Sequence, residues 1–468
     1  MKKKLVSAML VLSMCSSLVA CGNSGANDDV VGTEAGTESA SATDGSGESE
    51  ISMPDGYDAT SSSIYNEQLG DFYTAYQTAL EAEDLDERFA LEAIAEAKLM
   101  ESAVMVPTTT KGGAYAISRY VPYTSPNVLW GNDYERYHNR LSVEGDLIKA
   151  TDIEAMKAKY KELKGTGTYV EWVKSYLADQ GYTLKDSYSQ GYVSDPVTWD
   201  ALNTSLASDA ESIINTYDGL MEYDEEGELQ PALAESYEVS DDGLTYTFHI
   251  RQGVSWVDSQ GREVADVTAD DFVAGMQHMM DCQAGLEYLV QGIIVGADSY
   301  ISGETSDFSE VGVKAVDDYT LEYTLEKPTS YFMTMLGYGV FAPMSRSYYE
   351  SQGGKFGVEF DSSASDYTYG KDSNSIAYCG PYLVTSSTEK NSIIFELNES
   401  YWNAANVANK KITFVYDDGS DATKRYTDAT SGTIDGCPLT TSALELAKKD
   451  GNFDEYAYVS ATNATSFS

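Results

Sequence analysis

The sequence has little of the chemistry that hydrolases and metalloenzymes need. Only three histidines occur in 468 residues, His138, His249 and His278. H-E-x-x-H, G-x-S-x-G and paired C-x-x-C motifs are all absent. Adjacent acidic residues such as Asp270 and Asp271 do not face one another on a helix, so they indicate caps and turns rather than an acid/base couple. We therefore predict that the chain is not an enzyme and holds neither a cofactor nor a metal.

Basic side chains are also scarce. The chain has 30 Lys and Arg against 75 Asp and Glu, a formal net charge of −45. Such a field repels nucleic acid and anionic membrane surfaces and attracts cationic solutes, so we expect no nucleic-acid partner. The simpler interpretation is an acidic surface that keeps a secreted protein soluble.

Long apolar runs are missing, apart from a short one at the amino terminus. Three lysines precede an apolar run at residues 5–12, which is too short to span a bilayer. The segment ends in Leu-Val-Ala-Cys at residues 18–21, which predicts a secretory signal peptide over residues 1–20. This box resembles that of bacterial lipoproteins, which implies lipid attachment at Cys21. We expect an extracytoplasmic protein that is anchored to the cell membrane by lipid.

Three cysteines remain after that segment, Cys282, Cys379 and Cys437. Their spacing matches no zinc pattern, and an odd number permits at most one bridge among them. The sequence does not determine which two cysteines would form that bridge.

Two regions precede the most informative block. Residues 21–56 form a predicted disordered acidic linker: residues 22–50 contain seven acidic residues and no Lys or Arg. Residues 57–185 are predicted to be a mainly helical extension, with helical spacing over 64–81, 85–102, 151–164 and 169–180. This extension is either separate or part of the first lobe described below.

Residues 217–281 carry the clearest local pattern. After the turn at residues 241–243, apolar and polar residues alternate from Leu244 to Ile250, which predicts a half-buried strand. Thr268 and Asp271 have the spacing of a capping box and predict the start of a helix. Phe272, Val273, Met276, Met279 and Met280 would form the apolar face of that helix.

The same block resembles a known family. It reads YDGLMEYD…LQPALAESYEVSDDGLTYTFHIRQGVSW…VTADDFVAGMQHMMD, and further blocks follow as GVKAVDDYTLE, AYCGPY, YWN and GTID. Their order is similar to that of the oligopeptide/dipeptide-binding proteins, family 5 of the extracytoplasmic solute receptors of ABC transporters. The likeness covers residues 186–468.

The resemblance implies an α/β fold, a type II periplasmic-binding-protein-like lobe with an inserted subdomain. Lobe I would comprise residues 186–220 and 380–468, and the inserted subdomain residues 221–379. In the family a second lobe follows a crossover strand that residues 456–467 resemble, so the second lobe looks truncated. Residues 84–107 are similar to the helix-then-proline element near the carboxyl end of such receptors; the alternative is an unrelated helical extension.

The family's mechanism implies a receptor that closes over an oligopeptide and delivers it to the transmembrane permease subunits of an ABC importer. An extended peptide would be held through main-chain hydrogen bonds. Two positions depart from the family pattern, Ala461 where an aromatic residue is frequent and Cys437 where Asn is common. The positions that match the family's ligand-facing segments are Thr204, Ser205, Leu206, Ala207, Tyr288, Gln291, Cys437, Leu439, Ala461, Thr462 and Asn463.

Three alternatives stay open. One is a receptor for another solute, such as a nickel chelate or an oligosaccharide. Another, from a different class, is a secreted hydrolase, and the third is a scaffold or sensor with no transported ligand. Binding of peptides without product formation would support the predicted receptor over these alternatives.

Overall fold

The computed structural model describes residues 61–82, 84–105, 107–111, 114–126, 128, 133–460 and 464–467. The predicted signal peptide, Cys21, the acidic linker and residues 461–463 lie outside these residues. These described residues divide into two compact units, one that holds those from 61 to 109 and 465–467, and one that holds those from 110 to 464. Each unit is described by itself.

The first unit is built on a helical hairpin. Helices α2 (Ser61–Leu80) and α3 (Leu85–Ser102) pack through Leu69, Phe72 and Leu99. The Asp84 carboxylate accepts a hydrogen bond of 2.9 Å from the Glu87 backbone and caps α3. Strands β1 (Pro107–Lys111) and β19 (Ala464–Phe467) pair in a two-stranded sheet. The two helices confirm the helical spacing found in the sequence.

In the second unit, one four-stranded sheet has the order β14-β15-β16-β5. Its strands are β14 (Tyr382–Thr388), β15 (Ser392–Leu397), β16 (Lys411–Tyr416) and β5 (Ser187–Tyr192). The pair β16–β5 is parallel and the other two pairs are antiparallel. Alternate residues of β15 and β16 are buried, as their apolar periodicity requires.

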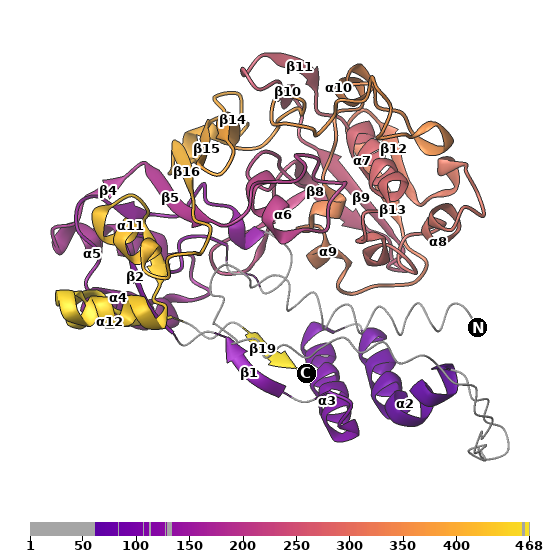
Figure 1. Cartoon of the computed structure of the whole chain (residues 1–468). Coiled ribbons are helices and arrows are strands. Elements are labelled where there is room, and N and C mark those ends of the chain that lie inside the picture. Colours follow the sequence, from indigo (N-terminus) through magenta and orange to yellow (C-terminus); the bar gives the residue numbers. More distant parts are fainter. Residues whose placement is uncertain are drawn as a thin grey trace, which may run out of the picture. The chain divides into compact units, whose positions relative to one another are not determined.

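A second four-stranded sheet, β12-β13-β9-β8, is antiparallel throughout. It contains β12 (Val313–Asp317), β13 (Thr320–Thr324), β9 (Thr245–Ile250) and β8 (Ala234–Val239). Tyr246, Phe248 and Ile250 are buried on β9, which confirms the predicted alternation. Helix α7 (Ala269–Cys282) lies against β12 and β13 (Figure 1) and begins with the predicted capping box of Thr268 and Asp271.

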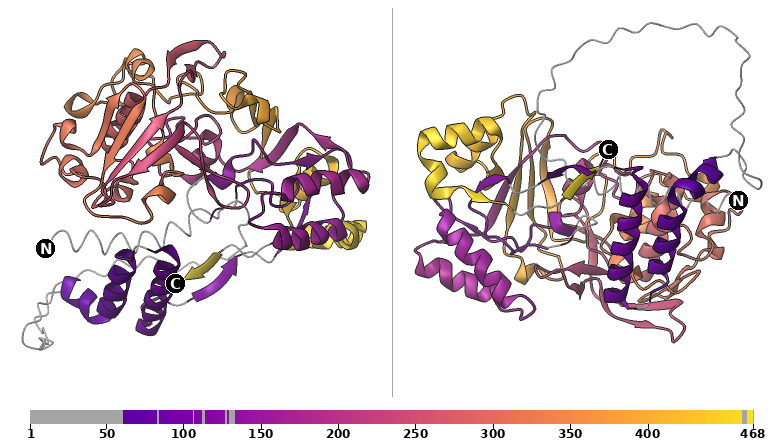
Figure 2. Two further views of the ribbon diagram at one scale, coloured as in Figure 1. Left: turned by 180° about the vertical axis from the view of Figure 1, so that it is seen from behind. Right: turned by 90° about the horizontal axis from the view of Figure 1, so that it is seen from below.

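A three-stranded sheet joins chain segments that are far apart in sequence. Strand β2 (Tyr115–Ser118) lies between β17 (Gly436–Pro438) and β18 (Tyr458–Val459). Helices α4 (Ala150–Leu163) and α5 (Tyr169–Asp179) lie beside α11 (Lys424–Ser431), α12 (Thr441–Asp450) and α13 (Asn452–Tyr456), as both views of Figure 2 show. Residues 110–185 therefore share one unit with the late strands.

The remaining elements are short. Helix α6 (Ala207–Ile213) has seven residues, and residues Glu287–Leu289 form a 3-10 turn. The others are α8 (Ala297–Ile301), α9 (Phe332–Met335), α10 (Arg346–Ser351), β3 (Ser142–Val143), β4 (Leu184–Lys185), β6 (Met221–Tyr223), β7 (Leu229–Pro231), β10 (Ser255–Val257) and β11 (Glu263–Asp266).

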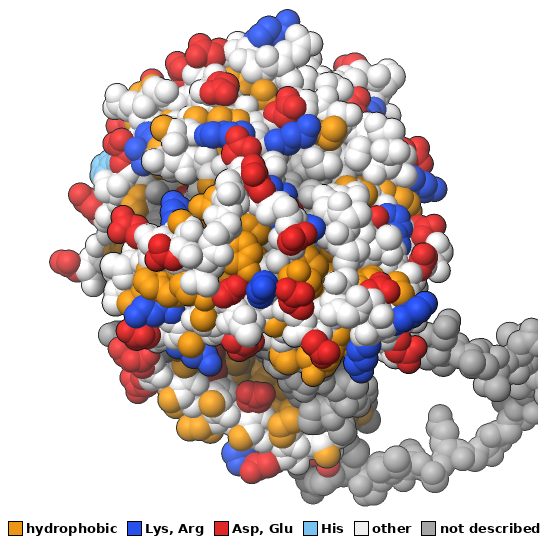
Figure 3. Space-filling view, turned by 90° about the vertical axis from the view of Figure 1, so that its left-hand side faces the viewer, with side chains coloured by type: hydrophobic (Ala, Val, Ile, Leu, Met, Phe, Trp, Pro, Cys, Tyr) orange, Lys and Arg blue, Asp and Glu red, His pale blue; other side chains and the backbone are white. Residues whose placement is uncertain are grey.

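None of the described helices combines the length and the hydrophobicity that crossing a bilayer requires. On the face shown in Figure 3, basic side chains are interspersed with acidic ones, so the negative charge does not form one continuous patch there.

Candidate functional site

The first predicted ligand-facing segment is the loop before α6. Thr204 Oγ1 donates to Asp209 Oδ2 over 2.7 Å, and the Leu206 backbone N–H donates to Thr204 Oγ1 over 3.1 Å. Asp209 is fully buried and also accepts from the Val197 backbone over 2.8 Å. The hydrogen bonds to the buried Asp209 thus hold the loop in place, while Ser205 and Leu206 stay exposed.

The second predicted segment lies against the first. A methyl group placed on Gly285 would be 3.6 Å from Ser205 Oγ, so the loop that leads to Tyr288 lies next to the loop before α6. Gly285 has a φ of +105°, which a side chain would strain. Its N–H donates to Glu287 Oε1 over 2.9 Å. Tyr288 and Gln291 are half-buried. The structure therefore brings together two segments that are some 80 residues apart.

The third predicted segment is placed differently. Cys437 pairs with Ile117 across β17 and β2, and the Leu439 N–H donates to the Tyr115 carbonyl over 2.7 Å. Both side chains are buried in a hydrophobic cluster separate from the one that Tyr288 packs against. Burial raises the pKa of the Cys437 thiol to about 12. Ala461, Thr462 and Asn463 lie outside the described residues.

All three cysteines of the described chain are free thiols. One of them belongs to a mixed cluster of potential metal ligands, Asp200, His278 and Cys282, whose ligand atoms lie within 4.8 Å of one another. His278 Nε2 is 2.7 Å from Asp200 Oδ2, and the Cys282 sulfur is 3.4 Å from Nε2 and 3.6 Å from Nδ1.

This geometry is that of a hydrogen-bonded core cluster. A sulfur nearly equidistant from both ring nitrogens lies over the imidazole rather than in line with either lone pair. The aromatic rings of Tyr349, Phe360 and Tyr369 surround His278. Burial, with the nearby Asp200 and Asp281 carboxylates, raises the pKa of the Cys282 thiol far above its ordinary value. The thiol is therefore protonated and is not an activated nucleophile.

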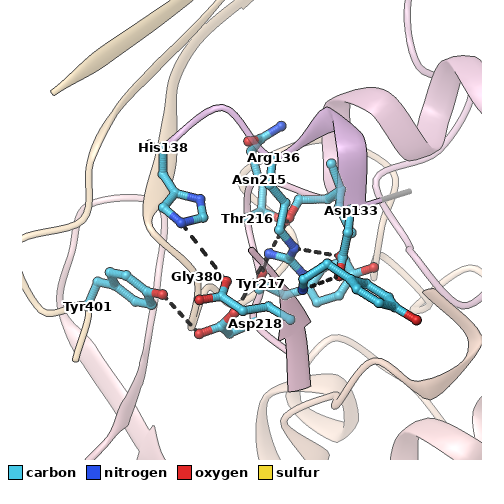
Figure 4. A network of polar contacts seen from close by, with 12 residues as sticks. Asp133, Arg136, His138, Asn215, Thr216, Tyr217, Asp218, Gly380 and Tyr401 are labelled. Atoms are coloured by element: carbon cyan, nitrogen blue, oxygen red, sulfur yellow. Dashed lines mark hydrogen bonds and ion pairs between the residues drawn. The ribbon is translucent and has the colours of Figure 1, made fainter. Parts of the chain in front are cut away.

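A second buried polar cluster centres on Arg136 (Figure 4). Arg136 Nε donates to Asp133 Oδ1 over 2.8 Å, and Nη1 donates to the carbonyls of Ile214 and Tyr217 over 3.1 and 2.9 Å. Nη1 also lies 3.7 Å from Asp218 Oδ1. Although burial opposes the charge, Asp133 and Asp218 raise the pKa of Arg136. The guanidinium is therefore held charged between two carboxylates.

Asp218 extends the cluster toward later segments of the chain. Its Oδ2 accepts from the Tyr401 hydroxyl over 3.0 Å and from Trp402 Nε1 over 2.8 Å. Tyr401 and Trp402 belong to one of the sequence blocks that carry the family resemblance. Here they hold a buried carboxylate, so their role in the described structure is to join segments of the core.

Two further side chains lie at the edge of this cluster. His138 Nε2 is 4.0 Å from Glu222 Oε2, and neither Glu222 Oε2 nor His138 Nδ1 has a hydrogen-bond partner within the described structure. Burial, followed by the Asp218 charge, raises the pKa of Glu222 to about 8. Burial, followed by the Arg136 charge, lowers the pKa of His138 to about 3. At neutral pH the histidine is therefore uncharged and the carboxyl is mostly protonated.

Sequence reasoning did not assign roles to these residues. A signal was present, because Arg136, His138 and Arg140 alternate within five residues of a chain that is poor in basic groups. A short basic stretch in an acidic protein indicates pairing with buried carboxylates. The partners could not be named, since Asp218 and Glu222 are some 80 residues away.

Comparison with known proteins places the chain in a family. Residues 228–467 match the model described as bacterial extracellular solute-binding proteins, family 5 Middle. This match spans just over half of the 468 residues. The resemblance noted in the sequence is thereby confirmed.

The curated relatives are considerably longer than the region they share with this chain. The oligopeptide-binding protein AmiA of Streptococcus pneumoniae is 39% identical over 272 residues, which cover 58% of this chain and 40% of AmiA. AliA of the same species is 37% identical over 326 residues, covering 68% of this chain and 45% of AliA. The chain thus spans less than half the length of these relatives.

Solved structures give a similar picture. The substrate-binding domain of an oligopeptide ABC transporter from Bacillus anthracis is 27% identical, covers 57% of this chain and 48% of its own, and superposes with a TM-score of 0.48. On the strength of the family match, the chain belongs to the bacterial extracellular solute-binding proteins of family 5.

Proposed function

We propose that this chain is the solute-binding component of an ABC importer, that it is held outside the cell membrane by lipid on Cys21, and that its ligand is an oligopeptide. The observation that carries the proposal is the match of residues 228–467 to the family-5 model together with curated relatives named as oligopeptide-binding proteins. The protein would bind its solute and pass it unchanged to the permease.

The peptide site would include the loop of Thr204, Ser205, Leu206 and Ala207 together with Tyr288 and Gln291. The proximity of Gly285 to Ser205 supports this grouping, because it places the two loops next to each other. An exposed loop with a fixed backbone can pair with an extended peptide regardless of its sequence. Cys437 and Leu439 stay outside this grouping, because their side chains are buried in a separate hydrophobic cluster, and residues 461–463 lie outside the described structure.

Calorimetry with a mixed library of three- to eight-residue peptides on the full-length protein tests the proposal. Heat of binding with peptides, none with oligosaccharides or nickel chelates, and no cleaved product are expected. Binding of sugars or chelates alone, or hydrolysis of the peptides, would replace peptide capture with one of the alternative functions.

A matched pair of variants tests the location of the site. Gln291→Ala removes a half-buried amide in the proposed site, whereas Gln260→Ala removes an exposed amide in a turn between β10 and β11. We expect weaker peptide binding only for the first. Equal affinities for both variants and the unaltered protein would exclude Gln291 from the site.

A further inference from the structure

One buried hydrogen bond links the two loops of the proposed peptide site, residues 204–207 and residues 285–291. Oδ2 of Asp200 lies 2.7 Å from Nε2 of His278. Asp200 comes four residues before the first loop, and His278 lies one turn before the carboxyl end of α7, which leads into the second loop. The pair therefore joins the chain that enters the first loop to the helix that enters the second.

The Asp200 carboxylate also shapes the turn in which it lies. Its Oδ1 accepts from the Leu202 N–H over 3.1 Å, and the Asp200 carbonyl accepts from the Asn203 N–H over 3.2 Å. A methyl group on Gly370 would lie only 2.5 Å from Cβ of Asp200, so the backbone there packs directly against this side chain. One buried carboxylate thus holds both the turn before the first loop and the helix before the second.

The histidine end of the pair is enclosed by the core. His278 is fully buried. Three aromatic rings pack around its imidazole, those of Tyr349, Phe360 and Tyr369. The sulfur of Cys282, the last residue of α7, is 3.4 Å from Nε2, and the next residue, Gln283, ends the helix in a left-handed conformation with φ +48°. The imidazole therefore supports the final turn of α7, from which the second loop departs.

A polar pair is not needed to fill this space. Replacing a buried pair of polar partners by apolar side chains of similar volume is often neutral or stabilising, because the cost of removing polar groups from water disappears. A hydrogen bond, in contrast, is satisfied only within a narrow range of distance and angle. The pair is therefore expected to act on where the two loops lie rather than on the net stability of the core.

The first loop has a separate attachment that provides an internal comparison. Asp209 is fully buried and accepts from the Thr204 hydroxyl over 2.7 Å and from the Val197 N–H over 2.8 Å. Both donors belong to the segment between β5 and α6. This attachment therefore concerns the first loop alone, whereas the bond between Asp200 and His278 concerns both loops.

We infer that Asp200 and His278 are positioning residues for peptide binding, and that their hydrogen bond sets the two loops at the spacing the peptide requires. The inference rests on the proposed function, because it concerns the loops assigned to the peptide there. Neither side chain touches the peptide; each acts through the loop that its own segment enters. Loops held in place before binding favour affinity, because less conformational freedom is lost when the ligand arrives.

Hydrogen exchange of the free full-length protein tests the link without any ligand. The double variant Asp200→Asn/His278→Leu removes the bond and leaves no unpaired carboxylate, while the amide oxygen can still accept from Leu202. Amides in residues 204–207 and in residues 285–291 should both exchange about tenfold faster, with β9 and β13 unchanged. Unchanged exchange in either loop would overturn the inference.

Thr204→Val is the comparison for that experiment. It removes the hydroxyl that binds Asp209 and keeps the shape of the side chain, so only residues 204–207 should exchange faster. Faster exchange of residues 285–291 in Thr204→Val, to the same extent as in the double variant, would show that the loops are coupled without the Asp200–His278 bond and would overturn the inference.

Peptide affinity provides the functional measurement, by calorimetry with the mixed peptide library at a temperature where circular dichroism shows each variant folded. The double variant should bind about tenfold more weakly. His278→Gln retains an N–H donor and should restore affinity to within about threefold of the unaltered protein. Asp271→Asn disturbs the cap at the opposite end of α7 and should leave affinity unchanged.

The outcomes separate this inference from the proposed function. No peptide binding by the unaltered protein would overturn the proposed function, and with it the role of the pair in peptide binding. Equally tight binding by the unaltered protein and the double variant would overturn the inference alone. Equal losses of affinity in the double variant and in Asp271→Asn would also overturn it, because the pair would then act through overall stability.

Discussion

Two buried aspartates, Asp271 and Asp218, use their carboxylates in different ways. Asp271 Oδ2 accepts from the Thr268 backbone over 2.8 Å and from Trp256 Nε1 over 3.0 Å, and Oδ1 accepts from the Arg346 backbone over 3.1 Å. Asp218 accepts side-chain hydrogen bonds only at Oδ2. Its Oδ1 has no hydrogen-bond partner within the described structure and lies 3.7 Å from Nη1 of Arg136.

The two carboxylates therefore differ in how completely they are hydrogen-bonded. The Asp271 carboxylate has donors on both oxygens and closes the start of α7, so it is a structural cap. The Arg136 cluster has several carboxyls around one guanidinium, and Asp218 Oδ1 and Glu222 Oε2 have no hydrogen-bond partner within the described structure. This cluster is therefore less completely hydrogen-bonded than the cap at Asp271.

The largest loss of stability is expected when the Arg136 guanidinium is removed. Arg136→Met leaves Asp133 and Asp218 buried without their cation, which we expect to destabilise the protein by about 3–5 kcal/mol. Urea denaturation followed by tyrosine and tryptophan fluorescence measures the loss. Lys159→Met removes a surface partner of Glu162 and should change little. A similar small change for Arg136→Met would mean that the cluster does not hold the core.

The next largest loss of stability is expected from disturbing the close packing at Gly380, next to the Arg136 cluster. A methyl group on Gly380 would lie 2.5 Å from the Tyr217 backbone nitrogen, next to a carbonyl that Arg136 uses. Gly380→Ala should therefore destabilise the protein by about 1–3 kcal/mol, read from the same denaturation curves. Gly70→Ala places its methyl in open space on α2 and is expected to be neutral or stabilising. Equal effects would contradict the close approach.

The dependence of folding stability on pH tests the raised pKa of Glu222. The folded-state pKa of Glu222, about 8, lies above its ordinary value of 4.5, so the folded protein holds a proton that the unfolded chain has lost. Stability from this group is complete below about pH 4.5 and falls as pH rises to about 8, by up to about 1.4 kcal/mol per pH unit. Glu222→Gln should flatten this slope between pH 5 and 8. An unchanged slope would contradict the raised pKa.

The smallest effect is expected at the structural cap. Asp271→Asn keeps one acceptor for the Thr268 N–H but loses the charge, and should destabilise the protein by about 1 kcal/mol. Thermal denaturation at pH 7 measures it, with Glu263→Gln, at an exposed position on β11, as the control. If Asp271→Asn proved as damaging as Arg136→Met, the two clusters would not differ in the proposed way.

The sequence predicted those parts of the fold that are set by local pattern. The strand around Phe248 follows from alternation, and the start of α7 follows from the spacing of Thr268 and Asp271. Helix α3 has the predicted bounds because Asp84 caps it and Ala103 ends it in a left-handed turn. The family blocks predicted the solute-binding fold, and the family match confirmed it.

Features that depend on contacts between distant segments of the chain could not be predicted from the sequence. Helix α6 ends at Ile213, and the nearby Asn215 Nδ2 donates to the Glu135 carbonyl over 3.0 Å, a tertiary contact that no local pattern predicts. Strand β2 has only four residues, and its partners on β17 and β18 lie more than 300 residues away. The Arg136 cluster likewise assembles from segments that no local pattern connects.

The most direct test of the proposed receptor is hydrogen exchange of the full-length protein with and without a mixture of short peptides. Peptide capture at the proposed site predicts slower exchange of the backbone amides in both residues 204–207 and residues 285–291, because the two loops share one surface. Protection confined to other segments, or none at saturating peptide, would contradict the account.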